Sequence, residues 1–343
     1  MSRGAPTPAG LRTTGLRVAV VALTAAVGTA LASCGLQPAA SYVPKADPGS
    51  IEHIEGLPDD AAITVTAKNF TEQLVLGKIA VIALTAAGFH VTDMTNVPGS
   101  QAVRQLMLDG KADMTFEYTG TAWLTYLGHK EGIPDPEKQF EAVRDADAAN
   151  GLTWLPPAPM NNTYALAVRA GAVDELGGIT KLSQLKDLPV SQRTFCVESE
   201  FNSRPDGFRP MLEKYGLKLG SSGKDGVPTR NVKILDTGTV YTATADGTCN
   251  FGEVFTTDGR ITSLNLQVLA DDKGFFPAYN GAPVVNTATL DEYPGIKDVF
   301  SGLTPKLTND VMRSLNRKVD VDGEDPGDVA FDWMVSEGFV TAP

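Results

Sequence analysis

The sequence predicts an α/β protein built as two lobes, and three features indicate this. Strand-like and helix-like segments alternate from about Ala61 onward, which is typical of a mainly parallel sheet. The alternation starts afresh near residue 193, so two similar units are expected to follow one another. The length of 343 residues is enough for two hydrophobic cores.

The first series contains three strand-like segments of β-branched and apolar residues. They are ITVTA (63–67), HVTDMTNV (90–97) and MTFEY (114–118). Between the first two, Asn69 and Glu72 have the spacing of a capping box, which predicts the start of a helix there.

The second series repeats this pattern. Its strand-like segments are RTFCVES (193–199), NVKILD (231–236) and CNFGEVF (249–255), with a helix expected over 205–215.

A weak internal repeat links the two series. DGKADMTFEYTG starts at Asp109 and DGTCNFGEVFTTDG at Asp246, and each has an aromatic residue nine positions after the Asp. Asp-Gly before a strand is common turn chemistry, so chance similarity is an open alternative. If the repeat is structural, Tyr118 and Phe255 are equivalent rings that point at a cleft between the lobes.

Charge excludes some partners. The formal net charge is −12, and the 29 Lys and Arg residues are scattered along the chain. Because a nucleic-acid surface needs clustered basic residues, no nucleic-acid partner is expected.

The N-terminus has the features of a lipoprotein signal peptide over residues 1–33. Three arginines lie before and at the edge of an apolar stretch at 18–32 that is too short to span a bilayer comfortably. It ends in LASCG (31–35), which resembles a lipobox and predicts that Cys34 carries the lipid. The alternative is an ordinary secretory signal with an incidental cysteine.

The following segment, 34–60, is rich in Pro, Gly, Ala and Asp and is expected to be a flexible spacer. Together these features predict an extracytoplasmic protein held at the cell membrane by a lipid anchor.

No pattern of catalytic or metal-binding residues is recognisable. The three histidines, His53, His90 and His129, have no zinc-site spacing, and the chain has no nucleophile elbow or phosphate-binding loop. The acidic segment 320–328 fits a calcium loop poorly, because its glycine is misplaced, and Asp325 is better explained as a helix cap. We expect no enzyme, no cofactor and no metal.

Two cysteines remain besides Cys34. Cys196 and Cys249 both fall in strand-like segments of the second series, and an exported protein can form a disulfide between them. The alternative is two buried free thiols.

Five segments carry a resemblance to a known family: AKNFTEQLVLG (67–77), FEYTGTAWLTYLG (116–128), EFNSRPDGF (200–208), FTTDGRI (255–261) and DDKGFFPAYNGAPVV (271–285). In this order they resemble the substrate-binding proteins of ABC transporters for glycine betaine, choline and carnitine. The resemblance implies a two-lobed type II periplasmic-binding-protein fold with two crossover hinge strands. It also implies a monomer that delivers a quaternary ammonium ligand to permease subunits.

The resemblance implies crossings near 162–166 and 279–284. The expected lobes are then 61–162 with 279–343 for the first and 163–278 for the second.

Four rings match the family's ligand cage: Tyr118, Tyr164, Phe255 and Tyr279. Phe255 stands where the family usually has tyrosine. A trimethylammonium cation has no N–H to donate, so ring faces suit it better than hydrogen bonds. For each ring, core packing is the alternative explanation.

Other matched positions are Arg204 for a ligand carboxylate, Lys68 and Thr121 as pocket-lining residues, and Asn162 for backbone carbonyl dipoles. Lys68 would repel a quaternary ammonium unless it faces a ligand carboxylate or is tied to Glu72 or another acid. Arg204 as a solvated loop charge and Thr121 as a helix cap are the alternatives. A second functional hypothesis is the same fold binding an aromatic or polyol solute by ring stacking.

Overall fold

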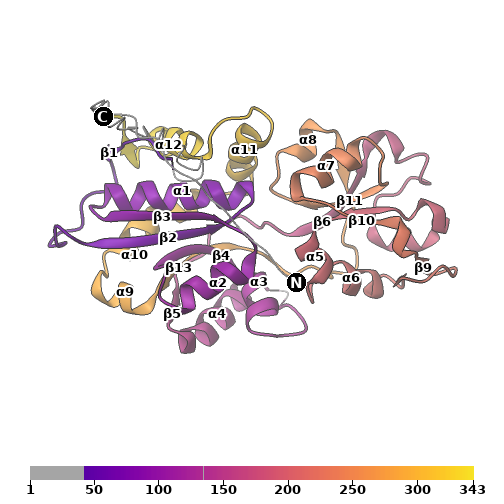
Figure 1. Ribbon diagram of the computed structural model, residues 1–343, viewed down its shortest axis with the longest axis horizontal. Helices are drawn as coiled ribbons and strands as arrows, with labels where there is room; N and C mark the ends of the chain where they lie inside the picture. The colour runs from indigo at the N-terminus through magenta and orange to yellow at the C-terminus, as the bar shows by residue number, and fades with distance from the viewer. Residues whose placement is uncertain (1–41, 134) are drawn as a thin grey trace, which may run out of the picture. The chain divides into compact units, whose positions relative to one another are not determined.

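Two five-stranded sheets organise the chain in the computed structural model, which describes residues 42–133 and 135–343 (Figure 1). The first sheet has the order β3-β2-β4-β13-β5. Its strands are β2 (Ala62–Lys68), β3 (His90–Val97), β4 (Met114–Tyr118), β5 (Leu152–Trp154) and β13 (Gly281–Asn286). The second sheet has the order β10-β7-β11-β6-β12. Its strands are β6 (Tyr164–Arg169), β7 (Phe195–Val197), β10 (Val232–Ile234), β11 (Phe251–Phe255) and β12 (Leu266–Val268).

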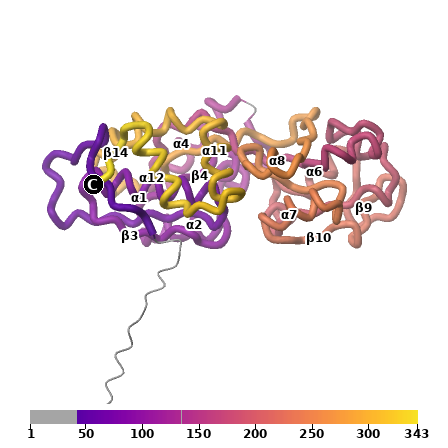
Figure 2. The backbone as a smooth tube through the Cα atoms, turned by 90° about the horizontal axis from the view of Figure 1, so that it is seen from above, coloured from indigo at the N-terminus to yellow at the C-terminus, as the bar shows by residue number. Residues whose placement is uncertain are grey.

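Helices accompany each sheet (Figures 1 and 2). Those of the first lobe are α1 (Thr71–Ala86), α2 (Ser100–Leu108), α3 (Thr119–Thr121), α4 (Pro136–Asp147), α9 (Thr287–Glu292), α10 (Ile296–Leu303), α11 (Asn309–Asp320) and α12 (Pro326–Ser336). Those of the second lobe are α5 (Ser199–Ser203), α6 (Phe208–Lys214), α7 (Thr237–Ala245) and α8 (Arg260–Ser263). The expected cap of the last helix is confirmed, because the Asp325 side chain accepts from the Gly327 N–H at 2.7 Å. No helix in the described part of the chain is long and apolar enough to cross a membrane.

The two sheets share one topology. In the first sheet β2 pairs in parallel with β3 and β4, and in the second β7 pairs in parallel with β10 and β11. Each sheet also has one strand that is antiparallel to both of its neighbours and is the first that the chain enters after a crossing. That antiparallel strand is β13 in the first lobe and β6 in the second. The repeat predicted from sequence is therefore structural, with Tyr118 and Phe255 as the last residues of β4 and β11.

The chain passes from one sheet to the other twice, between β5 and β6 and again between β12 and β13. The two connecting segments meet in an isolated bridge between Asn161 and Asn280. The crossings predicted near 162–166 and 279–284 adjoin these segments and extend into β6 and β13.

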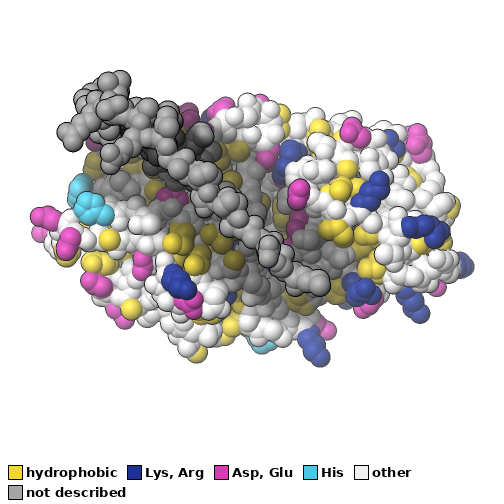
Figure 3. All heavy atoms as spheres, viewed as in Figure 1, with side chains coloured by type: hydrophobic (Ala, Val, Ile, Leu, Met, Phe, Trp, Pro, Cys, Tyr) yellow, Lys and Arg dark blue, Asp and Glu magenta, His cyan; other side chains and the backbone are white. Residues whose placement is uncertain are grey.

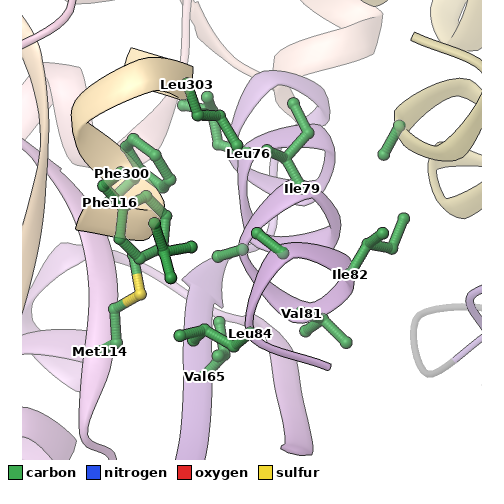
Figure 4. Packing of buried hydrophobic residues seen from close by; sticks show 14 of the residues in the cluster. Val65, Leu76, Ile79, Val81, Ile82, Leu84, Met114, Phe116, Phe300 and Leu303 are labelled. Carbon is green, nitrogen blue, oxygen red and sulfur yellow. The ribbon is translucent and has the colours of Figure 1, made fainter. Parts of the chain in front are cut away.

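The first lobe packs around α1, whose residues are buried on almost every side (Figure 4). Leu76 and Ile79 of this helix belong to the same apolar cluster as Val65 and Phe116 of the sheet. Phe116 also meets Phe300 edge to face, with ring centroids 6.0 Å apart. A helix that is buried nearly all round and mostly apolar, with a few paired polar residues such as Lys78, suits such a central position between a sheet and outer helices.

Part of the expected spacer belongs to the fold, so that prediction is wrong from Asp47 onward. β1 (Asp47–Pro48) pairs antiparallel with β14 (Val340–Thr341), and Ile51 is only 6% exposed. The Ile54 N–H donates to the Ala87 carbonyl at 3.0 Å. The partner strand lies at the other end of the chain, so local composition did not reveal it. The predicted signal peptide and Cys34 lie outside the described residues.

The second lobe contains a further small sheet, β8 (Lys218–Leu219) with β9 (Gly226–Val227), and a disulfide. Cys196 of β7 is bonded to Cys249, just before β11, with the two Cα atoms 5.7 Å apart. On the face drawn in Figure 3, Lys and Arg side chains are separate spots with Asp and Glu among them, as their scatter along the sequence predicts.

Glu253 of β11 is buried in the second lobe without an ion pair to any residue in the described ranges. It is 4% exposed and accepts from the Glu198 N–H at 2.8 Å. Burial raises the pKa of this carboxyl to about 8 from an ordinary value of 4.5. Between those two pH values the native state keeps a proton that the unfolded chain has lost, so stability falls as pH rises.

We therefore predict that Glu253→Gln raises the thermal unfolding midpoint at pH 8 and changes it much less near pH 5. The amide removes the cost of burying a charge, on the order of a few kcal/mol at the higher pH. Calorimetric scans at both pH values measure the difference. Glu213→Gln, at an exposed position on α6, is the control and should show no pH-dependent difference. Equal midpoint shifts at both pH values for Glu253→Gln would contradict the prediction.

Candidate ligand-binding site

One pocket of about 550 Å³ lies between the two lobes. It is lined by all eight residues that the sequence analysis expects to bind ligand: Lys68, Tyr118, Thr121, Asn162, Tyr164, Arg204, Phe255 and Tyr279. Most of them lie at the ends of strands or in the crossing segments. Such positions are where α/β proteins commonly bind ligands, because loops at strand ends can approach from both sides.

Strand register positions the rings. Tyr118 ends β4 opposite Gly281, and Phe255 ends β11 opposite Tyr164. The Tyr164 and Phe255 ring centroids are 5.1 Å apart, and Tyr164 meets Tyr279 edge to face at 5.7 Å.

Phe70 is a fifth ring that the sequence analysis missed. It lies half-buried directly before α1 and lines the same pocket. Its ring stacks with Phe255 at 5.3 Å and with Tyr118 at 6.3 Å, so it connects the two equivalent rings of the lobes. The available signal was its place in AKNFTEQ, two residues after the end of β2.

Lys68 forms an ion pair with Glu117. This is one of the arrangements that the sequence analysis gave as compatible with a cationic ligand. The Lys68 Nζ lies 2.6 Å from the Glu117 Oε1, and both side chains are 4% exposed. Glu117 also accepts from the Tyr126 hydroxyl at 2.7 Å. Because the pair is buried and close, its two charges compensate each other locally.

Arg204 is also paired inside the protein. Its Nε and Nη2 contact the two Asp206 oxygens at 2.7 and 2.5 Å, and Nη1 lies 3.2 Å from Glu200. Nη2 further contacts the Thr121 hydroxyl at 3.4 Å. Arg204 is 5% exposed, so the alternative of a solvated loop charge is wrong.

Thr121 directly precedes a π-helix turn, Ala122–Tyr126, but its side chain makes no capping hydrogen bond there. It is the last residue of the short helix α3, and its buried hydroxyl faces Arg204 across the lobes.

Glu72 does not form the predicted capping box with Asn69. Phe70 is the residue that flanks α1, and the Asn69 Oδ1 accepts from the Gly99 N–H at 3.4 Å. The Glu72 carboxylate instead accepts from the Tyr118 hydroxyl at 2.8 Å and from the Asn316 amide at 3.1 Å. Glu72 thus forms hydrogen bonds with residues distant in the sequence instead of with the backbone at the start of its own helix.

Glu72 is 3% exposed, and burial raises the pKa of its carboxyl, while hydrogen bonds from Thr257, Tyr118, Asn316 and Asn162 oppose the shift. Burial is also the largest cause that raises the pKa values of Tyr118 and Tyr279. Both phenols therefore keep their protons at neutral pH and donate to carboxylates, Tyr118 to Glu72 and Tyr279 to Asp206.

Comparison with known proteins identifies the family. Residues 61–336 match the family described as the substrate-binding domain of ABC-type glycine betaine transport systems. The chain belongs to this family.

A curated relative from Pseudomonas aeruginosa, named a glycine-betaine-binding protein, is 36% identical over 288 residues, which are 81% of this chain and 89% of the relative. The solved structure of apo YehZ from Escherichia coli is 28% identical, with a TM-score of 0.60, and covers 81% of this chain and 99% of that one. A structure described as a glycine betaine/carnitine/choline ABC transporter has a TM-score of 0.65 at 24% identity, with 81% and 99% coverage, and supports the fold alone.

The family is a solute-binding component of transporters, and the two-lobed periplasmic-binding-protein fold predicted from sequence is confirmed. Its members act outside the cytoplasm. The expectation about each ligand-binding residue remains a prediction, although the structure brings all eight to one pocket.

Gly120 allows the close approach of Tyr279. A Cβ atom at Gly120 would lie 2.6 Å from two ring carbons of Tyr279 and 2.9 Å from the Ala278 carbonyl. Neither neighbour is the end of a flexible chain, so one of them must move.

We predict that Gly120→Ala destabilises the protein by about 1–3 kcal/mol, because the added methyl overpacks the wall of the pocket. Gly302→Ala is the matched control: it lies in α10, and no atom comes within 4 Å of the place its added methyl would take, so it should be neutral or slightly stabilising. Urea unfolding of both variants measures the effect. Equal free energies of unfolding for Gly120→Ala and the wild type would refute the close contact.

Proposed function

We propose that this protein binds a quaternary ammonium osmoprotectant, such as glycine betaine, choline or carnitine, and delivers it to the permease of an ABC transporter. The observation that carries the proposal is the group of rings around the pocket: Phe70, Tyr118, Tyr164, Phe255 and Tyr279. Ring faces attract a trimethylammonium group, which offers no N–H to hydrogen-bond acceptors. The name of the Pseudomonas aeruginosa relative supports the same ligand class.

The energetics are sufficient. Each favourable ring contributes about 0.5–2 kcal/mol toward a cation, so the five rings together supply several kcal/mol. A micromolar complex needs roughly 8 kcal/mol, and exclusion of water from around the bound head group contributes to the remainder.

The charges of the pocket are compatible with a cation. Lys68 is compensated by Glu117, and Arg204 by Asp206 with Glu200, so neither presents a free positive charge. Arg204 keeps one Nη1 hydrogen that no hydrogen bond in the described residues uses, and we propose it for a ligand carboxylate. We assign Thr121 the role of orienting Arg204 and Asn162 that of lining the head-group site.

The cellular setting belongs to the same proposal. The lipobox-like LASCG before and around Cys34 supports a lipid anchor on the outer face of the cell membrane. We propose that the protein acts there as a monomer, presenting its ligand to the permease subunits.

We predict that Tyr164→Ala and Phe255→Ala each weaken choline binding by about 1–3 kcal/mol, which is about 5–150-fold in dissociation constant. Each change removes a ring face and admits water. Titration calorimetry with choline and with glycine betaine measures the effect.

Phe276→Leu is the matched control, because Phe276 packs against Tyr164 with centroids 6.3 Å apart but does not line the pocket. It should bind choline as the wild type does. If the wild type binds neither trimethylammonium compound at millimolar concentration, the proposal fails, and binding of an aromatic or polyol solute would then establish the stacking hypothesis.

We further predict that Cys34→Ala abolishes labelling by a fatty-acid analogue and releases the protein from membranes. The thiol is the only attachment point for the lipid that LASCG implies. Fractionation and metabolic labelling measure both effects. Unchanged membrane retention of the variant would refute the anchor.

A further inference from the structure

The carboxylates around the pocket differ in how their charge is compensated. Glu117 is paired with Lys68, and Asp206 with Arg204. Glu72 is as deeply buried as these acids, yet it forms no ion pair with any residue in 42–133 or 135–343.

The groups that donate hydrogen bonds to Glu72 are neutral. Its two oxygens accept from the Tyr118 hydroxyl of β4 and the Asn316 amide of α11, and Asn316 also donates to the Thr257 carbonyl of the second lobe at 3.0 Å. The Asn162 amide of the first crossing contacts the same Tyr118 hydroxyl at 3.4 Å.

One cation, Arg260, lines the small cavity beside Glu72, but it already forms ion pairs with two other carboxylates. Arg260 lies 2.5 Å from Asp258 and 3.4 Å from Asp320. This contact joins α8 to α11, which lie next to each other in Figures 1 and 2. Arg260 therefore does not supply the counter-charge that Glu72 lacks.

The Tyr118 ring lines the ligand pocket, where the Lys68 ammonium, paired with Glu117, lies 5.0 Å from the ring centroid. A phenol that donates its proton to a carboxylate is polarised, and negative charge shifts toward its ring. An electron-richer ring binds a cation more strongly, while its attraction for a neutral group of the same shape changes little.

Resting on the proposed function, we propose that Glu72 is a positioning and specificity residue: it acts through the Tyr118 hydroxyl and makes the cage prefer a cation over a neutral solute of equal size. The bound ammonium then takes the place of the missing counter-ion. Glu72 itself does not line the main pocket, so its effect on the ligand passes through the ring.

The test compares choline with 3,3-dimethylbutan-1-ol, its neutral analogue, in which carbon replaces the ammonium nitrogen. Glu72→Gln keeps the shape and an acceptor oxygen for Tyr118 but removes the charge. We expect choline to bind about 5–10-fold more weakly and the neutral analogue to bind within about twofold of wild type. Titration followed by NMR measures both at millimolar concentrations.

Glu253→Gln is the matched control, since Glu253 is also buried without an ion pair among the described residues but bonds to the Glu198 backbone instead of a cage ring. It should leave the affinity ratio of the two ligands unchanged. Equal weakening of both ligands by Glu72→Gln would indicate a purely structural role and would overturn the inference, as would no change in either.

A double-mutant cycle with choline gives a second measurement. Tyr118→Phe removes the hydroxyl that links Glu72 to the ring, so the loss from Glu72→Gln should shrink to within about twofold in that background. Additive losses would overturn the inference. Failure of the wild type to bind choline would instead refute the proposed function, so the two failures are distinguishable.

Discussion

The pairing of each lobe's third strand with a crossover strand is the constraint on which the pocket depends. β4 pairs with β13 and β11 with β6, so Tyr118 lies opposite Gly281 and Phe255 opposite Tyr164. Since β6 and β13 are each entered directly from a crossing segment, the ends of these strands face the junction of the lobes. A slip of one residue in either pairing would turn its ring to the other face of the sheet.

Around these rings the protein compensates its own charges before any ligand arrives. Lys68 and Arg204 each have a carboxylate partner within 2.6 Å, and each also lies over a tyrosine ring, Tyr118 at 5.0 Å and Tyr164 at 5.4 Å. Each of these cations is therefore compensated by a carboxylate while it contacts a ring of the pocket. Because the pairs are buried, removing one partner would destabilise the protein by leaving the other charge unpaired in a poorly solvated site.

Much of the fold was predictable because it depends on local patterns. The strand HVTDMTNV coincides with β3, and the repeat of Asp-Gly, strand and aromatic residue marked β4 and β11 as equivalents. The exception was the segment from Asp47, whose pairing partner is the last strand of the chain. Composition describes what a segment can do alone, whereas a distant partner decides whether it is ordered.

For the site, the family resemblance carried by the sequence motifs predicted eight residues that all line the pocket, although it did not point to Phe70. Only the tertiary structure decided what those residues touch. Lys68 could have joined Glu72 or another acid, and its partner became Glu117; Glu72 could have capped its own helix and instead met Tyr118 and Asn316. Such choices depend on distances between residues dozens to hundreds of positions apart, and burial, which sets the cost of an unpaired charge, exists only once the chain has folded.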